Sequence, residues 1–255
     1  MKAFNAFTKK EFLESVRSYR MVILAAVMFL LGTMSPLTAK LLPELISGVD
    51  LGGGMMLFLP EPTAFDSWTQ FYSNVGQMGM LALIISFSGI MANELSRGTL
   101  VNLLTKGMKR HTVILSKFLA ASVIWTGAYA ICLTVCYVYT EFFWPAHELN
   151  NVFLAFISPW LFGELMIAIL VFGGVLFGNF YGSLLSCFGI IITLATLNIV
   201  PTVQKFNPIN LAGGTLALLY DQSELSEFIP AAVICIAAIL LLIATSIAVF
   251  NKKKV

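Results

Sequence analysis

Long apolar runs separated by short charged segments dominate the hydrophobic pattern of this chain. A membrane-spanning helix needs about 20 mostly apolar residues, because each residue rises about 1.5 Å and the hydrocarbon core is about 30 Å thick. The third run is longer than a bilayer requires, so we expect it to tilt or to project into water. The pattern predicts an all-α integral membrane protein with six transmembrane helices, at Met21–Ala39, Tyr72–Asn93, Thr112–Thr140, Phe153–Phe177, Ser183–Val200 and Phe228–Phe250.

The segment before the first run, residues 1–20, shows two distinct faces on a helical wheel. The apolar residues in one half are Phe4, Phe7, Phe12, Val16 and Tyr19, and the basic residues in the other are Lys2, Lys9, Lys10, Arg17 and Arg20. This predicts a basic amphipathic helix in the cytoplasmic interface of the membrane. The alternative is a charged leader that only satisfies the charge bias of cytoplasmic segments. No small-residue cleavage site precedes the first run, so we expect that span to be retained.

Two other segments between the runs are too short to span a membrane. Residues 41–71 contain three glycines at 52–54 and a Pro60-Glu61-Pro62 turn, and we expect them to lie against the outer membrane surface. Residues 201–227 contain the apolar stretch NLAGGTLALLY, which predicts short re-entrant or interfacial outer helices shielded by protein. Because no fixed-period repeat is found, residues 21–255 are expected to form a single six-span transmembrane domain.

Composition supports the same class and excludes others. The chain is 58% hydrophobic and 11% charged, with a mean hydropathy of +0.89, whereas soluble domains have about 25% charged residues. A net charge of +2 is too small to indicate nucleic-acid binding, so the expected partners are membrane lipid and protein. The cysteines have no metal-binding spacing and are expected to be packing residues inside apolar runs, at Cys132, Cys136, Cys187 and Cys235.

Basic residues are distributed unevenly between the two sides of the predicted membrane domain. Only Lys40 and Lys205 fall on one side, while the other thirteen of the fifteen Lys and Arg residues fall on the opposite side. Cytoplasmic loops carry the excess of positive charge. We therefore expect a multi-pass protein of the cell membrane with both termini in the cytoplasm, and the even number of spans agrees with this.

A charged segment with an apolar patch, residues 94–111, joins the second and third runs on the cytoplasmic side. Glu94 and Arg97 are spaced to form an ion pair on one helix face. A loop that only anchored the topology would not need the leucines that follow. The segment predicts a short amphipathic helix that docks into a groove on another protein, with the candidate contact residues Glu94, Arg97, Gly98, Thr99, Leu100, Leu103, Leu104, Lys109 and Arg110.

The run ELSRGTLVNLLTKGMKRHTVILSKFLAA resembles the first cytoplasmic loop of permeases from type-2 ATP-binding-cassette (ABC) exporters. The matching features are an acid, a Gly-Thr pair, a Leu-rich turn, a basic break and a Lys that enters the next helix, here Glu94, Gly98-Thr99, Leu103-Leu104, Lys109-Arg110 and Lys117. The resemblance extends in outline over the whole chain. It implies that residues 94–111 are a coupling helix, which receives the motion of an ATPase subunit and passes it to the spans.

The resemblance also implies partners and a division of labour. The sequence contains no GxxxxGK[ST] loop to cradle a nucleotide phosphate, so the chain is not expected to be an enzyme and needs no cofactor or metal of its own. ATP and Mg²⁺ are expected in a separate ABC ATPase subunit. A second permease copy is also implied, and an identical chain is favoured over a different one.

Candidate pathway or gating residues lie within the fourth run and at its end. Glu164 is a carboxyl inside a predicted span, which marks a functional site by default; the alternative is a hydrogen-bonded packing residue. Gly174 and Gly178, followed by Gly182, repeat every four residues and permit close helix contact. A gating role and simple packing both remain open for these glycines.

The predicted function is export of an amphipathic or hydrophobic substrate, such as a peptide toxin or an antimicrobial peptide. The abundance of Phe (21 residues) and Met (11 residues) favours an apolar, adaptable pathway, although these side chains could equally face lipid. One alternative is an ion-coupled secondary transporter, which would need several polar groups at mid-membrane. Another is a non-transport membrane anchor or assembly protein with the same topology.

Overall fold

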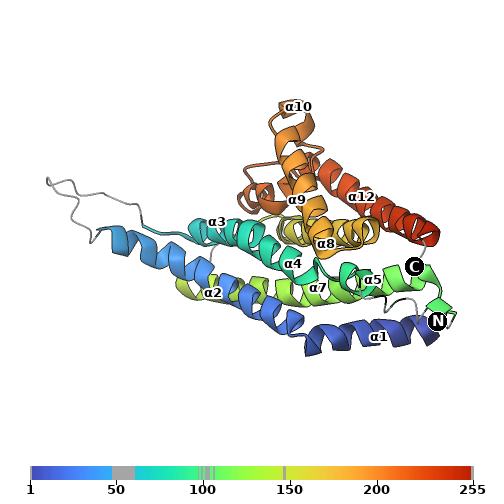
Figure 1. Cartoon of the computed structure of the whole chain (residues 1–255). Helices are drawn as coiled ribbons and strands as arrows, with labels where there is room; N and C mark the ends of the chain where they lie inside the picture. Colours follow the sequence, from blue (N-terminus) through green and yellow to red (C-terminus); the bar gives the residue numbers. More distant parts are fainter. Residues whose placement is uncertain are drawn as a thin grey trace.

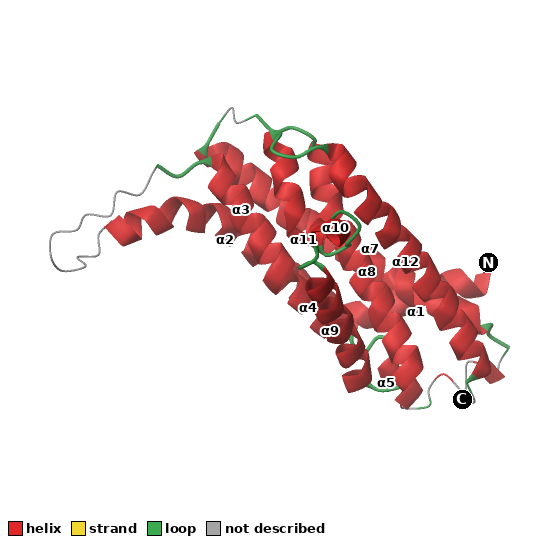
Figure 2. Ribbon diagram, turned by 90° about the horizontal axis from the view of Figure 1, so that it is seen from above, coloured by secondary structure: helices red, strands yellow, loops and turns green. Residues whose placement is uncertain are grey.

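The computed structural model describes residues 2–47, 61–96, 98, 100, 104–105, 107–145 and 148–253. Figure 1 shows a bundle of long helices with both chain ends at the same end of the molecule, next to the start of α7. Among the described residues no strand occurs, and Figure 2 shows helices joined by short connections. The long elements are α1 (Lys2–Arg17), α2 (Arg20–Ser47), α3 (Ala64–Asn74), α7 (Arg110–Phe143), α8 (Val152–Phe177), α9 (Phe180–Leu197) and α12 (Leu225–Lys252).

Shorter elements complete the second span and the segment before the last one. A π-helical turn, η1 (Val75–Gly79), continues α3 into α4 (Met80–Phe87), and α5 (Ala92–Ser96) follows after a turn. Between α9 and α12 lie α10 (Pro201–Gln204), α11 (Asn210–Gly213) and the 3₁₀ helix η2 (Gly214–Tyr220). The all-α prediction is therefore confirmed in the part of the chain that the structure describes.

Within the described residues, six helical stretches are long and apolar enough to cross a membrane, which confirms the six predicted runs. The second stretch, Ala64–Leu95, begins eight residues before the predicted Tyr72. The reason is a capping interaction, because the Asp66 carboxylate accepts hydrogen bonds from the backbone N–H of Thr63 at 2.8 Å and from its hydroxyl at 2.9 Å. The end of the segment assigned to residues 41–71 thus belongs to a helix.

The first helix, α1, lies close to the predicted range 1–20 and packs on α7. Arg17 ends it, and Tyr19 adopts a left-handed conformation with φ 59° at the turn into α2. One side chain of the predicted apolar face, Phe7, is only 4% exposed, whereas Tyr19 is 68% exposed. Part of this face is therefore covered by the chain itself, and placement of the helix at a membrane interface stays a prediction.

Helix α8 forms the centre of the bundle. In its most apolar window 78% of the residues are buried inside the chain, against 28% or less for α2, α9 and α12. It contacts α7, α9, α12 and the short elements α11 and η2. A helix enclosed in this way must be apolar on all sides, which explains why α8 shows no amphipathic pattern.

A proline within α8 leaves one backbone carbonyl without its usual hydrogen-bond donor, and side chains from other helices supply donors. Pro159 has no N–H, so the carbonyl of Ala155 has no donor in the helix. Tyr72 of α3 donates its hydroxyl to that oxygen at 2.8 Å, and Thr215 of η2 donates at 3.3 Å. The segment before the last span is thereby fixed to the central helix, and Leu211, Leu218 and Leu219 are fully buried there. These leucines of its apolar stretch pack against protein, while a re-entrant or interfacial position of the segment stays a prediction.

Helices α7 and α8 approach each other closely at one glycine. A Cβ atom on Gly163 would lie 2.3 Å from the ring of Trp125, closer than side-chain atoms approach in proteins. The Trp125 ring is fully buried, and its Nε1 donates to the carbonyl of Trp160 at 3.0 Å. The ring is therefore held from several sides and has little room to shift.

We expect Gly163→Ala to lower the stability of the protein by roughly 1–3 kcal/mol, the usual cost of an overpacked core. Thermal unfolding in detergent, followed by tryptophan fluorescence, measures this. The matched control is Gly189→Ala in α9, where an added Cβ meets no atom within 4 Å. Removing a helical glycine stabilises a helix by about 1 kcal/mol, so the control should melt at the same or a higher temperature. Equal losses in both variants would contradict the close approach.

Candidate coupling site

The structure describes some of the predicted coupling residues and not others. Glu94 lies in α5, Gly98 has a left-handed φ of 67° just after it, and Leu100 and Leu104 are helical. Lys109 is exposed and Arg110 begins α7. Arg97, Thr99 and Leu103 lie outside the described residues. The Glu94–Arg97 ion pair and the role of Leu103 therefore stay predictions.

The burial of Leu100 corrects one part of the predicted contact surface. Its side chain is 0% exposed and belongs to the hydrophobic core of this chain. Leu104 is partly buried against the same core. Because burial in its own chain already removes Leu100 from water, this side chain is not presented to a partner. Leu100 and Leu104 instead hold this part of the segment against the bundle.

Lys117 is a charged residue buried inside α7. Its side chain is 1% exposed, and its ammonium lies 2.8 Å from a carboxylate oxygen of Glu11 in α1 and 2.8 Å from one of Glu94 in α5. An isolated buried ammonium would be very costly, so a lysine persists there only with paired charges. Its Nζ also lies 5.9 Å from the ring centre of Phe7. Lys117 therefore joins three elements that are distant in sequence.

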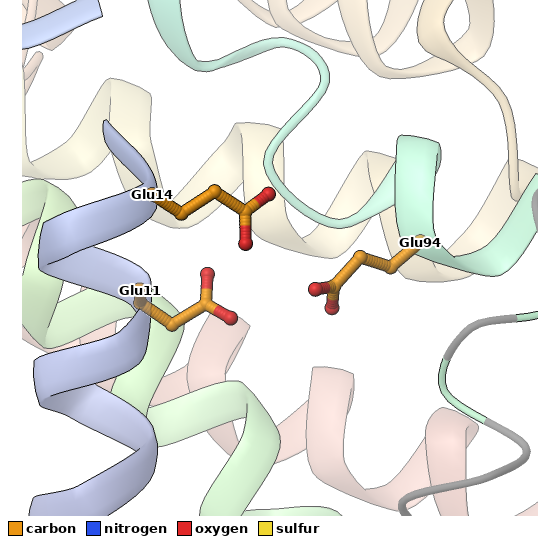
Figure 3. Close-up of side chains that lie close together, drawn as sticks. All are labelled: Glu11, Glu14 and Glu94. Carbon is orange, nitrogen blue, oxygen red and sulfur yellow. The ribbon is translucent and has the colours of Figure 1, made fainter. Parts of the chain in front are cut away.

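Lys10 completes the ion network from the exposed side. Its ammonium lies 2.6 Å from Glu94, 2.7 Å from Glu14 and 3.0 Å from Glu11. Figure 3 shows the three carboxylates converging, two from α1 and one from α5. A polar pocket of about 500 Å³ opens beside them and is also lined by Arg20 and Asn93. We call Lys10, Glu11, Glu14, Glu94 and Lys117 the ion network, which we predict to lie on the cytoplasmic side.

The pKa of Lys10 reflects its partners. Burial lowers this pKa, but hydrogen bonds to Glu14 and Glu94 and the charge of Glu11 outweigh burial and raise it above its usual range. The folded protein therefore favours the charged ammonium more than the unfolded chain does. The resulting contribution to stability is fully present below the ordinary lysine pKa and is lost only as pH rises through the raised one.

One carboxylate oxygen each from Glu11, Glu14 and Glu94 lies within 4.8 Å of the others, a spacing that could hold a cation. Two ammonium groups, those of Lys10 and Lys117, already pair with these three carboxylates. The network therefore has the chemistry of an ion-pair joint, with one carboxylate charge in excess.

Sequence reasoning identified Glu94 but missed its partners. The signal that could have found them was Lys117, which lies inside the predicted third span and therefore needed an acidic partner. Glu11 and Glu14, the acids of the basic N-terminal helix, were the available candidates. The pairing of Glu11 with Lys117 could not be read from the sequence spacing, because these two residues lie about 100 positions apart.

Arg110 has its own partners at the end of the last helix. Its guanidinium donates to the carbonyls of Phe250 and, at 2.6 Å, of Lys253. Lys253 in turn donates through Nζ to the carbonyl of Val175 at 2.8 Å, at the end of α8. Carbonyls in the last turn of a helix have no intrahelical donors and attract cations. Arg110 thus ties α7 to the end of α12, and Lys253 ties that end to α8. The coupling assignment did not anticipate this role of Arg110 within the chain.

Glu164 lies deep within the chain, between α7 and α8, and is 5% exposed. The hydroxyl of Ser122 in α7 donates to its Oε2 at 2.5 Å, while Oε1 has no partner among the described residues. One oxygen of this carboxyl is thus hydrogen-bonded within the chain, and both the pathway role and the packing role of Glu164 stay predictions.

The glycines at the end of α8 serve packing and helix termination. A Cβ on Gly174 would lie 2.9 Å from the Cβ of Met91, so the glycine allows α8 to approach the end of the second span. Gly178 has φ 71° and caps α8 by donating its N–H to the Gly174 carbonyl. Both positions thus have a structural reason to be glycine, and a gating role for them stays a prediction.

Comparisons with known proteins place this arrangement in context. A family model described as "ABC-2 family transporter protein" matches residues 6–255. The chain is also 30% identical over 142 residues to the uncharacterized transmembrane protein YxlG of Bacillus subtilis (strain 168). That similarity covers 55% of this chain and 55% of the relative, so the chain spans about half the length of the curated protein that it matches.

The ion network predicts a stability effect that depends on charge pairing. Lys117→Met should destabilise the protein by about 3 kcal/mol, the lower end for breaking a buried pair, because Lys10 still neutralises part of the acidic cluster. The exchanged pair Lys117→Glu with Glu11→Lys should recover a measurable part of the loss. Thermal unfolding in detergent measures both. Lys109→Met, an exposed change of the same type, is the control, and a melting temperature equal to that of Lys117→Met would refute the pairing.

Proposed function

This chain belongs to the ABC-2 family of transporter proteins, and we propose on that premise that it exports an amphipathic or hydrophobic substrate. Membership makes it a multi-pass membrane permease of an ABC transporter that acts with an ABC ATPase subunit. This favours ATP-driven transport over the ion-coupled secondary transporter and the non-transport anchor. In our proposal ATP and Mg²⁺ bind to the ATPase subunit, and this chain converts the motion of that subunit into substrate movement.

The observation that supports the coupling role is the ion network. Glu94 lies at the start of the segment that we assign to the ATPase contact, and its carboxylate is bound to Lys117 of the third span and to Lys10 of α1. A displacement of α5 would move these two charges with it, because separating a buried pair is strongly unfavourable. The network therefore transmits motion from the loop to α1 and α7 as one unit.

The remaining elements of the proposal concern topology and assembly. We place both termini in the cytoplasm of a cell-membrane protein, since thirteen of fifteen basic residues would then lie inside. We also propose that two identical chains form the pathway. Exposed apolar residues on α9 and α12, such as Leu185, Ile192 and Leu240, provide surface for a second copy or for lipid. A peptide is the substrate class that we favour, because an apolar pathway suits it better than a small ion.

The contact with the ATPase can be tested by affinity purification from the native membrane, with copurifying chains identified by mass spectrometry. We expect wild type to retain an ABC ATPase subunit and the double variant Arg97→Glu/Leu103→Asp to lose at least about 90% of it, since central interface residues each contribute about 2 kcal/mol. Lys252→Gln, an exposed change at the same end, serves as the control. An ATPase retained by the double variant would remove the coupling role from these residues.

The Glu94→Gln variant separates the transmission of motion through the ion network from binding of the ATPase subunit. This variant keeps the shape of the side chain but removes the charge that Lys10 and Lys117 share. We expect it to retain the ATPase subunit while substrate-stimulated ATP hydrolysis in proteoliposomes falls severalfold. Loss of the ATPase subunit would instead make Glu94 a contact residue, and unchanged stimulation would show that the network does not transmit motion.

A further inference from the structure

A groove between α1 and α7 is separate from the polar pocket described above. It lies on a different face of α1 from Lys10 and Glu14. It has a volume of about 350 Å³ and is lined by Phe4, Thr8, Lys9 and Phe12 of α1 and by Leu119 and Val123 of α7, among others. The described structure leaves it open to the exterior, since Leu119 is 41% and Val123 51% exposed. The ion network does not use this groove, so its shape and chemistry need a separate explanation.

The groove combines an apolar floor with a polar rim. The floor consists of the two phenylalanines and the aliphatic side chains of α7. On the rim, Lys9 is exposed and forms no ion pair with any described residue. The hydroxyl of Thr8 is buried and has no hydrogen-bond partner there. This hydroxyl is closed off from the exterior, so Lys9 is the polar group on the rim that a ligand in the groove can reach.

The position of the groove indicates which ligand can reach it. Leu119 and Val123 lie nine and thirteen residues beyond the first residue of α7, or about 13–20 Å at 1.5 Å per residue. Both residues belong to the stretch of α7 that is long and apolar enough to cross a membrane, so a lipid acyl chain can reach them. Under the topology proposed above, the cytoplasmic leaflet is the one with the negative surface charge that attracts lysine.

We propose that this groove binds one anionic phospholipid of the cytoplasmic leaflet. The acyl chain packs against Phe12, Leu119 and Val123, while the phosphate accepts a hydrogen bond from the Lys9 ammonium. The lipid then lies between α1 and the third span, directly beside the joint formed by Lys117. This inference rests on the proposed topology, because only a cytoplasmic α1 faces that leaflet.

The test is native mass spectrometry of the purified full chain in mild detergent, with equal amounts of phosphatidylglycerol and phosphatidylcholine. Wild type should retain phosphatidylglycerol preferentially, and Lys9→Gln should reduce that preference about fivefold, the effect of one surface lysine on anionic lipid. Lys252→Gln removes the same charge from an exposed position outside the groove and should leave the preference unchanged. Val123→Trp fills the groove and should reduce retention of both lipids.

Several outcomes would overturn the proposal. Equal retention of the two lipids by wild type, or equal losses in Lys9→Gln and Lys252→Gln, would show that no anionic lipid site exists here. Loss of the preference for phosphatidylglycerol in excess inorganic phosphate would show that the rim binds a free anion and not a lipid headgroup. A second copy of this chain as the occupant would appear as a dimer that Val123→Trp dissociates, without any lipid retained.

The lipid assay needs no ATPase subunit, so its failure is distinguishable from failure of the transport proposal. The topology can be tested separately with Ala6→Cys, because the native cysteines Cys132, Cys136, Cys187 and Cys235 are all buried. An impermeant maleimide should not label this variant on intact cells and should label it after the cells are opened. Labelling on intact cells would place α1 outside and overturn the choice of leaflet.

Discussion

A polar group in the interior of a membrane bundle can find a partner only within the protein, because the surrounding hydrocarbon offers none. This constraint accounts for the contacts that give the chain its tertiary structure. Lys117 draws Glu11 and Glu94 to α7, the free carbonyl of Ala155 draws Tyr72 and a threonine to α8, and the open ends of α8 and α12 draw basic side chains. Apolar packing is abundant everywhere, but it is not directional, and these polar contacts decide which helices meet.

The two ends of the bundle satisfy this constraint by different means. At the end where the termini lie, the partners are full charges, and they connect α1, α5, α7, α8 and α12. At the other end the donors are neutral groups, such as the Asn150 and Asn151 amides that donate to the Asp221 carboxylate. Ion pairs resist separation more strongly than neutral hydrogen bonds when buried. The charged end is therefore suited to receive a mechanical displacement, and it is the end at which we propose that the ATPase subunit binds.

Much of the architecture could be predicted from the sequence. The six spans follow from hydrophobic length alone, and the basic N-terminal helix follows from its two-sided pattern, so both appear in the structure. The start of the second span was misplaced by eight residues because the Thr63–Asp66 cap lies in a polar segment that hydropathy does not count as helix. Leu100 was read as a contact for a partner, since a short apolar patch looks the same whether its own chain or another covers it.

The sequence by itself determined the class of protein, the number of spans and the existence of charges that would need partners. Hydrophobic length and charge are properties of each segment, so they can be read without knowing what lies beside it. Only the tertiary structure decided that Glu11, Glu94 and Lys117 form one network, and that Arg110 closes the ends of other helices. Those contacts depend on which helix faces meet in space, and pairs separated by about 100 residues leave no local pattern.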